Sequence, residues 1–230
     1  MDFGKKSPFA AFYHFILTEN IKYLIFSNNM KNPLDKTSLL IKFAPEVGGV
    51  FSLSELSSLF DISSQQSLWI AVRQFESAGL LSRYCRGIYI TREFDSQILS
   101  AKVRADSYVS FGSALAYRRL IGTESPRLVT CVTPARAAEY SGDISLSYAK
   151  ISKDLFFGFE TLQNGVKVAD AEKAVLDTLY FYQHKKTFYF NIFQDIDFAS
   201  LSKEKLDSYL EQYKNPKFQA FVRNTIDGKV

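Results

Sequence analysis

The chain has 230 residues, enough for two domains of ordinary size, and its 47% hydrophobic and 15% aromatic content supports buried cores and excludes a disordered chain. A formal net charge of +4 permits nucleic-acid binding without requiring it, because affinity depends on where lysines and arginines cluster. Two cysteines, Cys85 and Cys131, give neither a disulfide framework nor a zinc site, which favours a reducing cytoplasm. We expect no membrane contact, since no apolar run approaches the roughly 18 residues of a membrane span and the first residues lack a signal-peptide core.

Apolar and aromatic residues recur from Ser7 to about Asn28 and predict a helix with a broad apolar face. Asn32 and Pro33 break this pattern, and Leu34 to Phe43 predicts a second, shorter helix. The following Glu46 to Gly49 predicts a flexible entry into the next motif. This prefix can pack on the domain that follows it or support contacts in a homodimer.

The stretch from Val50 to Thr91 has the layout of two short helices joined by a tight turn and followed by a two-stranded ribbon. A serine can cap the first helix, whose leucines recur every third residue on one face. A polar turn from Asp61 to Ser64 follows, and a serine in it can cap the second helix. The residues that carry these features are Ser52 or Ser54 as the first cap, Leu53, Leu56 and Leu59 on the helix face, and Ser63 or Ser64 as the second cap.

The second helix is predicted to run to about Ala78, where Gly79 ends it. Leu68, Val72 and Phe75 fall at i, i+4 and i+7 and therefore face the core. The remaining surface of the helix carries polar, aromatic and charged side chains, namely Gln65, Gln66, Trp69, Arg73 and Glu76.

Two segments rich in β-branched and aromatic residues, Leu80 to Tyr84 and Ile88 to Thr91, flank a turn at Cys85 to Gly87. They predict a hairpin that carries Arg83 and Arg86. Two helices followed by such a hairpin are typical of a winged helix-turn-helix, so residues 1–91, prefix included, are predicted to form a DNA-binding domain.

In a winged helix-turn-helix the second helix enters the major groove and the wing reaches phosphates. Glutamine can pair with adenine through two hydrogen bonds, and arginine binds phosphate or guanine. The residues expected toward the groove are Ser63, Ser64, Gln65, Gln66, Trp69 and Arg73, with Arg83 and Arg86 toward phosphates. Alternatively, the domain makes protein contacts only and these side chains are simply solvated, since the second helix carries a single basic residue.

Residues 92–107 are polar and predict a helical connector, after which residues 108–230 form a second domain. A helix at Phe111 to Ile121 is followed by strands at Arg127 to Thr133 and Ile144 to Ile151. The whole chain is therefore predicted to be α+β, with a mixed α/β second domain that contains antiparallel hairpins.

The dipeptide Asn164-Gly165 predicts a hairpin with a tight primed turn, because both residues tolerate a positive φ. Next, Asp170 can cap a helix and Glu172 favours its positive end. The hairpin strands are expected at Leu155–Leu162 and Val166–Ala169, and closing helices at Ser202–Tyr213 and Pro216–Ile226.

Five segments in this order give the second half a resemblance to the AbiEi family of bacterial antitoxins. The resemblance extends over roughly Val50 to Tyr182, since that family joins an N-terminal winged helix-turn-helix to a C-terminal antitoxin domain. The five segments are YVSFGSALAY at 108–117, TCVTPAR at 130–136, YAKI at 148–151, LFFGFE at 155–160 and VADAEKAVLD at 168–177.

The resemblance implies a type IV toxin–antitoxin system of the kind that acts in abortive phage infection. The antitoxin represses its own operon by binding operator DNA, and its second domain counteracts a nucleotidyltransferase-like toxin without needing a stable complex with it. The long aromatic prefix and the weakly basic second helix depart from the family pattern. A stand-alone regulator or a protein-interaction module is the alternative.

The sequence favours no enzyme, cofactor or metal site. A metal-dependent nuclease would need an acid and a lysine two residues apart on one strand, whereas Glu172 and Lys173 are adjacent and predicted to be helical. Asp170 is better explained as a cap, and the histidines, His14 and His184, lack catalytic partners at a recognisable spacing. Four arginines in the second domain could form a basic patch or simply be solvated: Arg118, Arg119, Arg127 and Arg136.

Overall fold

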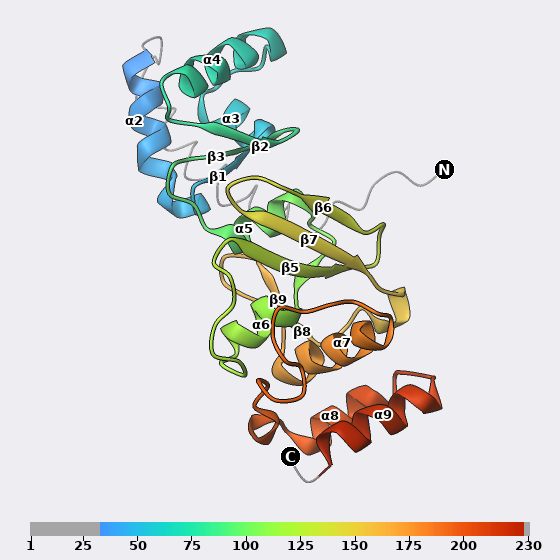
Figure 1. Ribbon diagram of the computed structural model, residues 1–230. Helices are drawn as coiled ribbons and strands as arrows, with labels where there is room; N and C mark the ends of the chain where they lie inside the picture. Colours follow the sequence, from blue (N-terminus) through green and yellow to red (C-terminus); the bar gives the residue numbers. More distant parts are fainter. Residues whose placement is uncertain (1–32, 228–230) are drawn as a thin grey trace, which may run out of the picture. The chain divides into compact units, whose positions relative to one another are not determined.

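The computed structural model describes residues 33–227, and the predicted helix at Ser7 to Asn28 lies outside them. The described residues have a mixed α/β fold with one β-sheet in each of two compact units, and the boundary between the units falls between Ala105 and Asp106 (Figure 1). No helix in the described range combines the length and the apolar character needed to cross a bilayer.

The first unit contains four α-helices in its described part, and their ends follow local sequence signals. Ser52 caps the second of them in a capping box: its hydroxyl accepts from Glu55 N at 3.2 Å, and the Glu55 carboxylate accepts from Ser52 N at 2.7 Å. Of the two candidate first caps, Ser52 is therefore correct. The helices are α2 (Pro33–Phe43), α3 (Leu53–Leu59), α4 (Gln65–Ser77) and α5 (Ser96–Val103).

The sheet of this unit has three antiparallel strands in the order β1-β3-β2. The predicted hairpin is confirmed as β2 (Ser82–Cys85) and β3 (Ile88–Ile90), whereas β1 (Val50–Ser52) was not predicted. The helices and the sheet bury one apolar cluster, in which the rings of Phe60 and Phe75 stack at 5.0 Å. Burial of this face fixes the orientation of α4 and leaves its other face in solvent.

The predicted flexible entry at Glu46 to Gly49 is wrong. Pro45–Val47 forms a 3-10 turn, and Gly48 and Gly49 follow with φ of 59° and 67°. Their carbonyls accept hydrogen bonds from Asp95 N at 2.8 Å and Thr91 N at 2.9 Å. A side chain at Gly49 would overlap the Glu93 carbonyl, so close backbone contact explains the glycine.

The predicted connector at 92–107 is instead mostly part of the first unit. Its helix α5 carries Lys102, whose ammonium donates to the Val50 carbonyl at 2.6 Å and to the Glu55 carboxylate at 2.8 Å. Burial lowers the pKa of Lys102, and the Glu55 carboxylate opposes that shift. An ion pair across nearly fifty residues of sequence ties α5 to the start of α3, which polarity along the chain did not indicate.

The second unit is built on a six-stranded sheet in the order β6-β7-β5-β4-β9-β8. The pairs β5–β7 and β4–β9 are parallel, and the other three are antiparallel, so the predicted hairpins describe only part of a mixed sheet. The strands β4 and β6 were not predicted. The strands are β4 (Tyr108–Val109), β5 (Leu128–Thr133), β6 (Ala138–Tyr140), β7 (Ser145–Lys150), β8 (Phe159–Thr161) and β9 (Lys167–Ala169).

The hairpin at Asn164-Gly165 is confirmed, but its turn type is wrong. Only Gly165 has a positive φ, 79°, while the Asn164 side chain accepts from Val166 N at 3.1 Å. Gly165 N donates to Leu162 O at 2.8 Å, and Leu162 N donates to Val166 O at 2.8 Å. The loop is therefore longer than a two-residue primed turn.

Four helices accompany this sheet, and Figure 1 shows α6 and α7 beside it with α8 and α9 beyond them. The helix α7 contacts each of the other three and is buried from Glu172 to Leu179. The predicted helix to Ile121 is too long, because α6 ends at Tyr117 and Arg119 takes a φ of 61°. The helices are α6 (Phe111–Tyr117), α7 (Ala171–Gln183), α8 (Lys203–Leu210) and α9 (Pro216–Ile226).

Candidate nucleic-acid interface

The helix α4 starts and stops where the sequence predicts. Of the two candidate caps it is Ser64 whose hydroxyl accepts from Ser67 N, at 3.4 Å, and Gly79 ends the helix with a φ of 70°. Leu68, Val72 and Phe75 are buried as predicted. The first residues of the helix are exposed. The helix face opposite the three buried residues is turned to solvent.

Four of the predicted groove residues lie together on that face. They line a shallow depression of about 500 Å³ with Ile70, which the prediction missed. Ile70 is 54% exposed, and its position one turn after Gln66 could have revealed it, although an isoleucine is normally assigned to the core. Gln65, Gln66 and Arg73 are exposed, Trp69 is half-buried, and Ser63 is exposed in the preceding turn.

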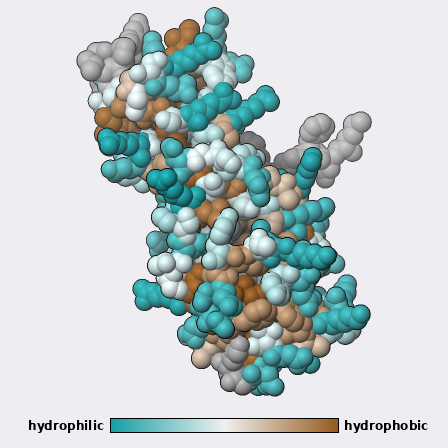
Figure 2. All heavy atoms as spheres, viewed as in Figure 1, coloured by the Kyte–Doolittle hydropathy of each residue, from teal (hydrophilic) through white to brown (hydrophobic). Residues whose placement is uncertain are grey.

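The β2–β3 hairpin carries the two predicted phosphate-binding arginines. Arg83 lies on β2 and donates from Nε to the Cys85 carbonyl at 3.4 Å, and Arg86 occupies the exposed turn. Gly87 has a φ of 80°, a conformation that glycine adopts without strain. Both guanidinium groups remain at the surface, which suits contact with phosphate. Figure 2 shows hydrophobic residues reaching the surface among hydrophilic ones over the visible face.

The four arginines of the second unit do not form one patch. Arg118 donates to the Ala169 carbonyl at 3.0 Å and pairs with Glu160 at 2.7 Å, so it joins the end of α6 to β8 and β9. Arg127 and Arg136 are both exposed but flank opposite ends of β5, a strand that spans about 16 Å at ~3.3 Å per residue. Arg119 is exposed just after α6.

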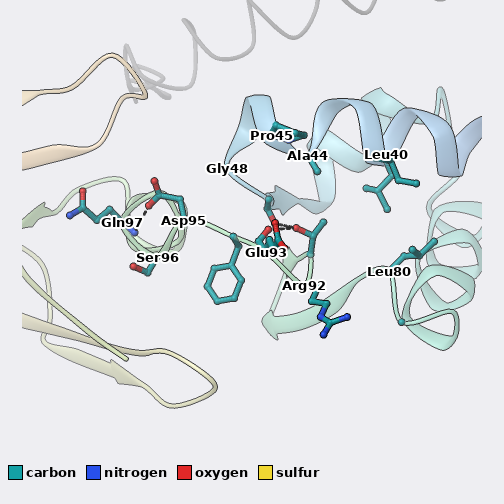
Figure 3. Close-up of a pocket in the computed structure, with 15 residues that line it drawn as sticks. Leu40, Ala44, Pro45, Gly48, Leu80, Arg92, Glu93, Asp95, Ser96 and Gln97 are labelled. Atoms are coloured by element: carbon teal, nitrogen blue, oxygen red, sulfur yellow. Dashed lines mark hydrogen bonds between the residues drawn. The ribbon is translucent and has the colours of Figure 1, made fainter. Parts of the chain in front are cut away.

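The first unit also contains an apolar pocket of about 1100 Å³, which no sequence pattern predicted (Figure 3). Leu40, Ala44, Pro45 and Leu80 supply part of its wall. The Asp95 carboxylate in the wall is engaged in the fold, since it caps α5 by accepting from Gln97 N at 2.7 Å and Ile98 N at 3.0 Å.

The acids that raised the nuclease alternative are engaged in the fold. Asp170 caps α7 by accepting from Lys173 N at 3.0 Å, as predicted, and also accepts from the Tyr209 hydroxyl at 2.8 Å. Glu172 lies in the first turn of α7 and accepts from Ser202 N at 3.0 Å, and Lys205 pairs with both acids at 3.0 Å. Among residues 33–227, no three His, Cys, Asp or Glu side chains gather as metal ligands.

A fully buried ion pair lies at the centre of the second unit. Lys173 donates to Asp177 at 2.5 Å and to the Tyr213 hydroxyl at 2.9 Å, with no exposed side-chain surface on either partner of the pair. The other Asp177 oxygen accepts from Tyr108 and Ser110, both at 2.8 Å. Burial and the Asp177 charge raise the pKa of Tyr108 well above its ordinary value, which keeps that hydroxyl a donor. These groups cross-link β4, α7 and the segment after α8.

Glu124 is an acidic residue that the sequence patterns did not identify as unusual. It lies in the loop between α6 and β5, packed so closely on Gly112 that a Cβ there would overlap its carboxyl group. Burial raises its pKa from 4.5 to about 7, and the Ser113 hydroxyl opposes that shift. Its Oε2 atom is buried and has no hydrogen-bond partner within residues 33–227.

This shift predicts a pH dependence of stability. Because the folded state raises the Glu124 pKa to about 7, its stabilising contribution is complete below about pH 4.5 and is lost as the pH rises through 7. Glu124→Gln should remove this contribution to the pH dependence and be more stable than the wild type at pH 8. Urea unfolding at pH 5 and pH 8 measures the difference, and an equal loss of stability in both proteins would contradict the assignment.

Comparison with known proteins gives a likeness in fold. No protein-family model and no curated protein matches the chain. Among solved structures, the RV2827C protein from Mycobacterium tuberculosis aligns with a TM-score of 0.55 and 12% identity, over 81% of this chain and 75% of that chain. At this identity the match concerns architecture alone, and the chain is similar to that protein in its mixed α/β fold.

Proposed function

We propose that the protein is a cytoplasmic DNA-binding antitoxin of a type IV toxin–antitoxin system. Its first unit is a winged helix-turn-helix that represses its own operon, and its second unit counteracts a nucleotidyltransferase-like toxin. It acts by binding rather than by catalysis and uses no cofactor. Its partners are operator DNA and the toxin's pathway, without a need for a stable complex with the toxin.

The observation that carries the DNA-binding part is the exposed face of α4. A capped helix that presents Gln65 and Gln66 from its first turn, and Arg73 about two turns later, suits the major groove, where glutamine and arginine read base edges. Three antiparallel strands follow the order of a winged domain, and their hairpin carries Arg83 and Arg86. The helix dipole also adds positive potential at the end of α4 that carries these glutamines.

The antitoxin part rests on the sequence resemblance, and the way its five segments pack supports it. Tyr108 and Ser110 belong to the first segment, whereas Asp177 belongs to the last. Their hydrogen bonds join the two ends of the pattern in one buried network. Residues far apart in the sequence thus serve one core, as expected if the five segments are the signature of a single domain.

A specific observation favours a second candidate function, a protein-interaction module. Ile70 is 54% exposed in the middle of the α4 face beside Trp69, and Arg73 is the only basic side chain there. Aromatic and aliphatic groups with one arginine are typical of protein interfaces. On this alternative the α4 face binds a protein and the DNA affinity is negligible.

Fluorescence anisotropy with the full chain separates the two functions. The probe is a duplex from directly upstream of the coding sequence. The DNA-binding function predicts tight binding that weakens steeply with salt, because lysines and arginines displace counterions from phosphates. Binding that is absent at low salt would favour the protein-interaction module.

Co-expression tests the antitoxin function separately. If a nucleotidyltransferase is encoded beside this gene, its expression alone should arrest growth, and co-expression of the full chain should restore growth. The double variant Arg73→Ala with Arg86→Ala should still restore growth when expressed from an unrelated promoter, because its second unit is unchanged. Failure of the wild-type chain to restore growth would leave a stand-alone regulator.

A further inference from the structure

A pocket of about 450 Å³ in the second unit has no role in the functions proposed above. Its wall comes from the start of α6, the loop between α6 and β5, the strands β5, β6 and β7, and the loop after α7. It contains two acids, Glu124 with an unused oxygen and Glu139, together with one base and several aromatic rings. Its lining includes Phe111, Glu124, Lys186 and Phe188.

Glu124 supplies the recognition chemistry. Its Oε2 is shielded from solvent and accepts no hydrogen bond from residues 33–227, although buried acceptors are normally paired. The bare backbone at Gly112 lets the carboxyl group lie against the start of α6. Rotation of the Glu124 carboxyl group into the pocket would let a ligand N–H group supply the missing hydrogen bond, and a carboxylate accepts from such donors strongly.

Phe111 adds a strained wall to the same pocket. Its φ of 53° is an outlier for a bulky residue, and such strain is found where function requires a fixed geometry. The ring is 1% exposed and packs at 5.7 Å from the ring of Phe188. Lys186 lies over the Phe111 ring with its ammonium at 5.4 Å, so a cation is placed beside the aromatic wall.

An acceptor and aromatic rings match the base of a nucleotide, and an ammonium group in the same pocket matches its phosphates. We propose that this pocket binds a free nucleotide, with the amino edge of the base at Glu124, the base against the aromatic rings, and the phosphates at Lys186. A volume of about 450 Å³ lies within the usual range of ligand pockets. Adenine, guanine and cytosine fit better than uracil, because uracil flanks its N–H with two carbonyl oxygens that a carboxylate repels.

Isothermal titration of the full chain with ATP, GTP, CTP and UTP tests the proposal. At least one of the three amino-bearing nucleotides should bind with Kd below about 1 mM, and more tightly than UTP. Glu124→Gln should weaken that nucleotide about tenfold or more, because an amide cannot offer two acceptors. Circular dichroism establishes that each variant is folded before titration.

Lys186→Ala separates the phosphate contact from the base contact. It should weaken the triphosphate about fivefold or more and leave the matching nucleoside nearly unchanged, because only the triphosphate carries the charge that Lys186 pairs with. The controls are Glu211→Gln and Lys153→Ala, both exposed and outside the pocket wall, which should bind as the wild type does. Absence of binding by all four nucleotides, or affinity unchanged in both pocket variants, would overturn the proposal.

Discussion

Replacement of Asp177 by alanine is expected to lower the free energy of unfolding of the second unit by about 3–5 kcal/mol. Removing the carboxylate leaves Lys173 buried without its counter-ion and takes the acceptor from Tyr108 and Ser110. Buried charges without partners carry a large desolvation cost, and among residues 33–227 Lys173 would keep only the Tyr213 hydroxyl and nearby aromatic rings as partners.

Two spectroscopic signals distinguish the units in this experiment. Trp69 is the one tryptophan of the chain and lies in the first unit, so its fluorescence follows that unit, whereas far-UV circular dichroism follows both. Asp177→Ala should shift the dichroism transition to lower urea and leave the Trp69 transition in place. Asp143→Ala, at an exposed loop position, is the control and should change stability by less than about 0.5 kcal/mol.

The double substitution Lys173→Met with Asp177→Leu tests whether the unpaired charge of Lys173 causes the loss of stability. If the unpaired charge causes the loss, the double variant should regain part of the stability lost in Asp177→Ala, since apolar groups of similar size can replace a buried pair. A loss in Asp177→Ala below about 1 kcal/mol would mean that the pair contributes little to the core.

The second large effect is expected in DNA binding. Arg73→Ala with Arg86→Ala should weaken binding to the upstream duplex about 10–100-fold near 0.1 M salt and reduce the salt slope by about 1, because Arg86 neutralises a phosphate whereas Arg73 contacts a base edge. Arg223→Ala, which removes an exposed arginine from α9 in the second unit, is the matched control. Equal affinities of the double variant and the control would remove these two arginines from the interface.

Gln65→Ala should have a different signature from the arginine variants. A glutamine that reads a base contributes about 1–3 kcal/mol of discrimination at one base pair. The Gln65→Ala variant should therefore bind duplexes that differ at that base pair with equal affinity. Affinity for unrelated DNA should stay constant. Anisotropy measurements with single-base variants of the upstream duplex detect this change.

Local signals in the sequence predicted the parts of the fold that depend on neighbouring residues. The caps at Ser52, Ser64 and Asp170, the helix stop at Gly79 and the hairpin turn at Gly165 follow from hydrogen bonds or φ values within four residues. The α4 face was predictable for the same reason, because helical spacing alone assigns Leu68 inward and Arg73 outward.

The remaining features depend on contacts that spacing along the chain does not encode. The strand β4 has two residues and exists through its pairing with β5 and β9, which come later in the sequence. Lys173 and Asp177 are spaced like an exposed helical ion pair, and only the layers on both sides of α7 bury them. In the sequence Arg118 cannot be distinguished from a surface arginine, because its partners on β8 and β9 come about forty to fifty residues later.

The affinity ratio between the upstream duplex and a shuffled duplex of equal length and composition, measured with the full chain at 0.15 M salt, tests the DNA-binding function most directly. A regulator that reads bases through α4 should prefer the upstream duplex about a thousandfold or more, and this preference should fall when Gln65 and Gln66 are replaced by alanine. Equal affinity for the two duplexes, or no binding to either, would contradict the assignment of α4 as a DNA-reading helix.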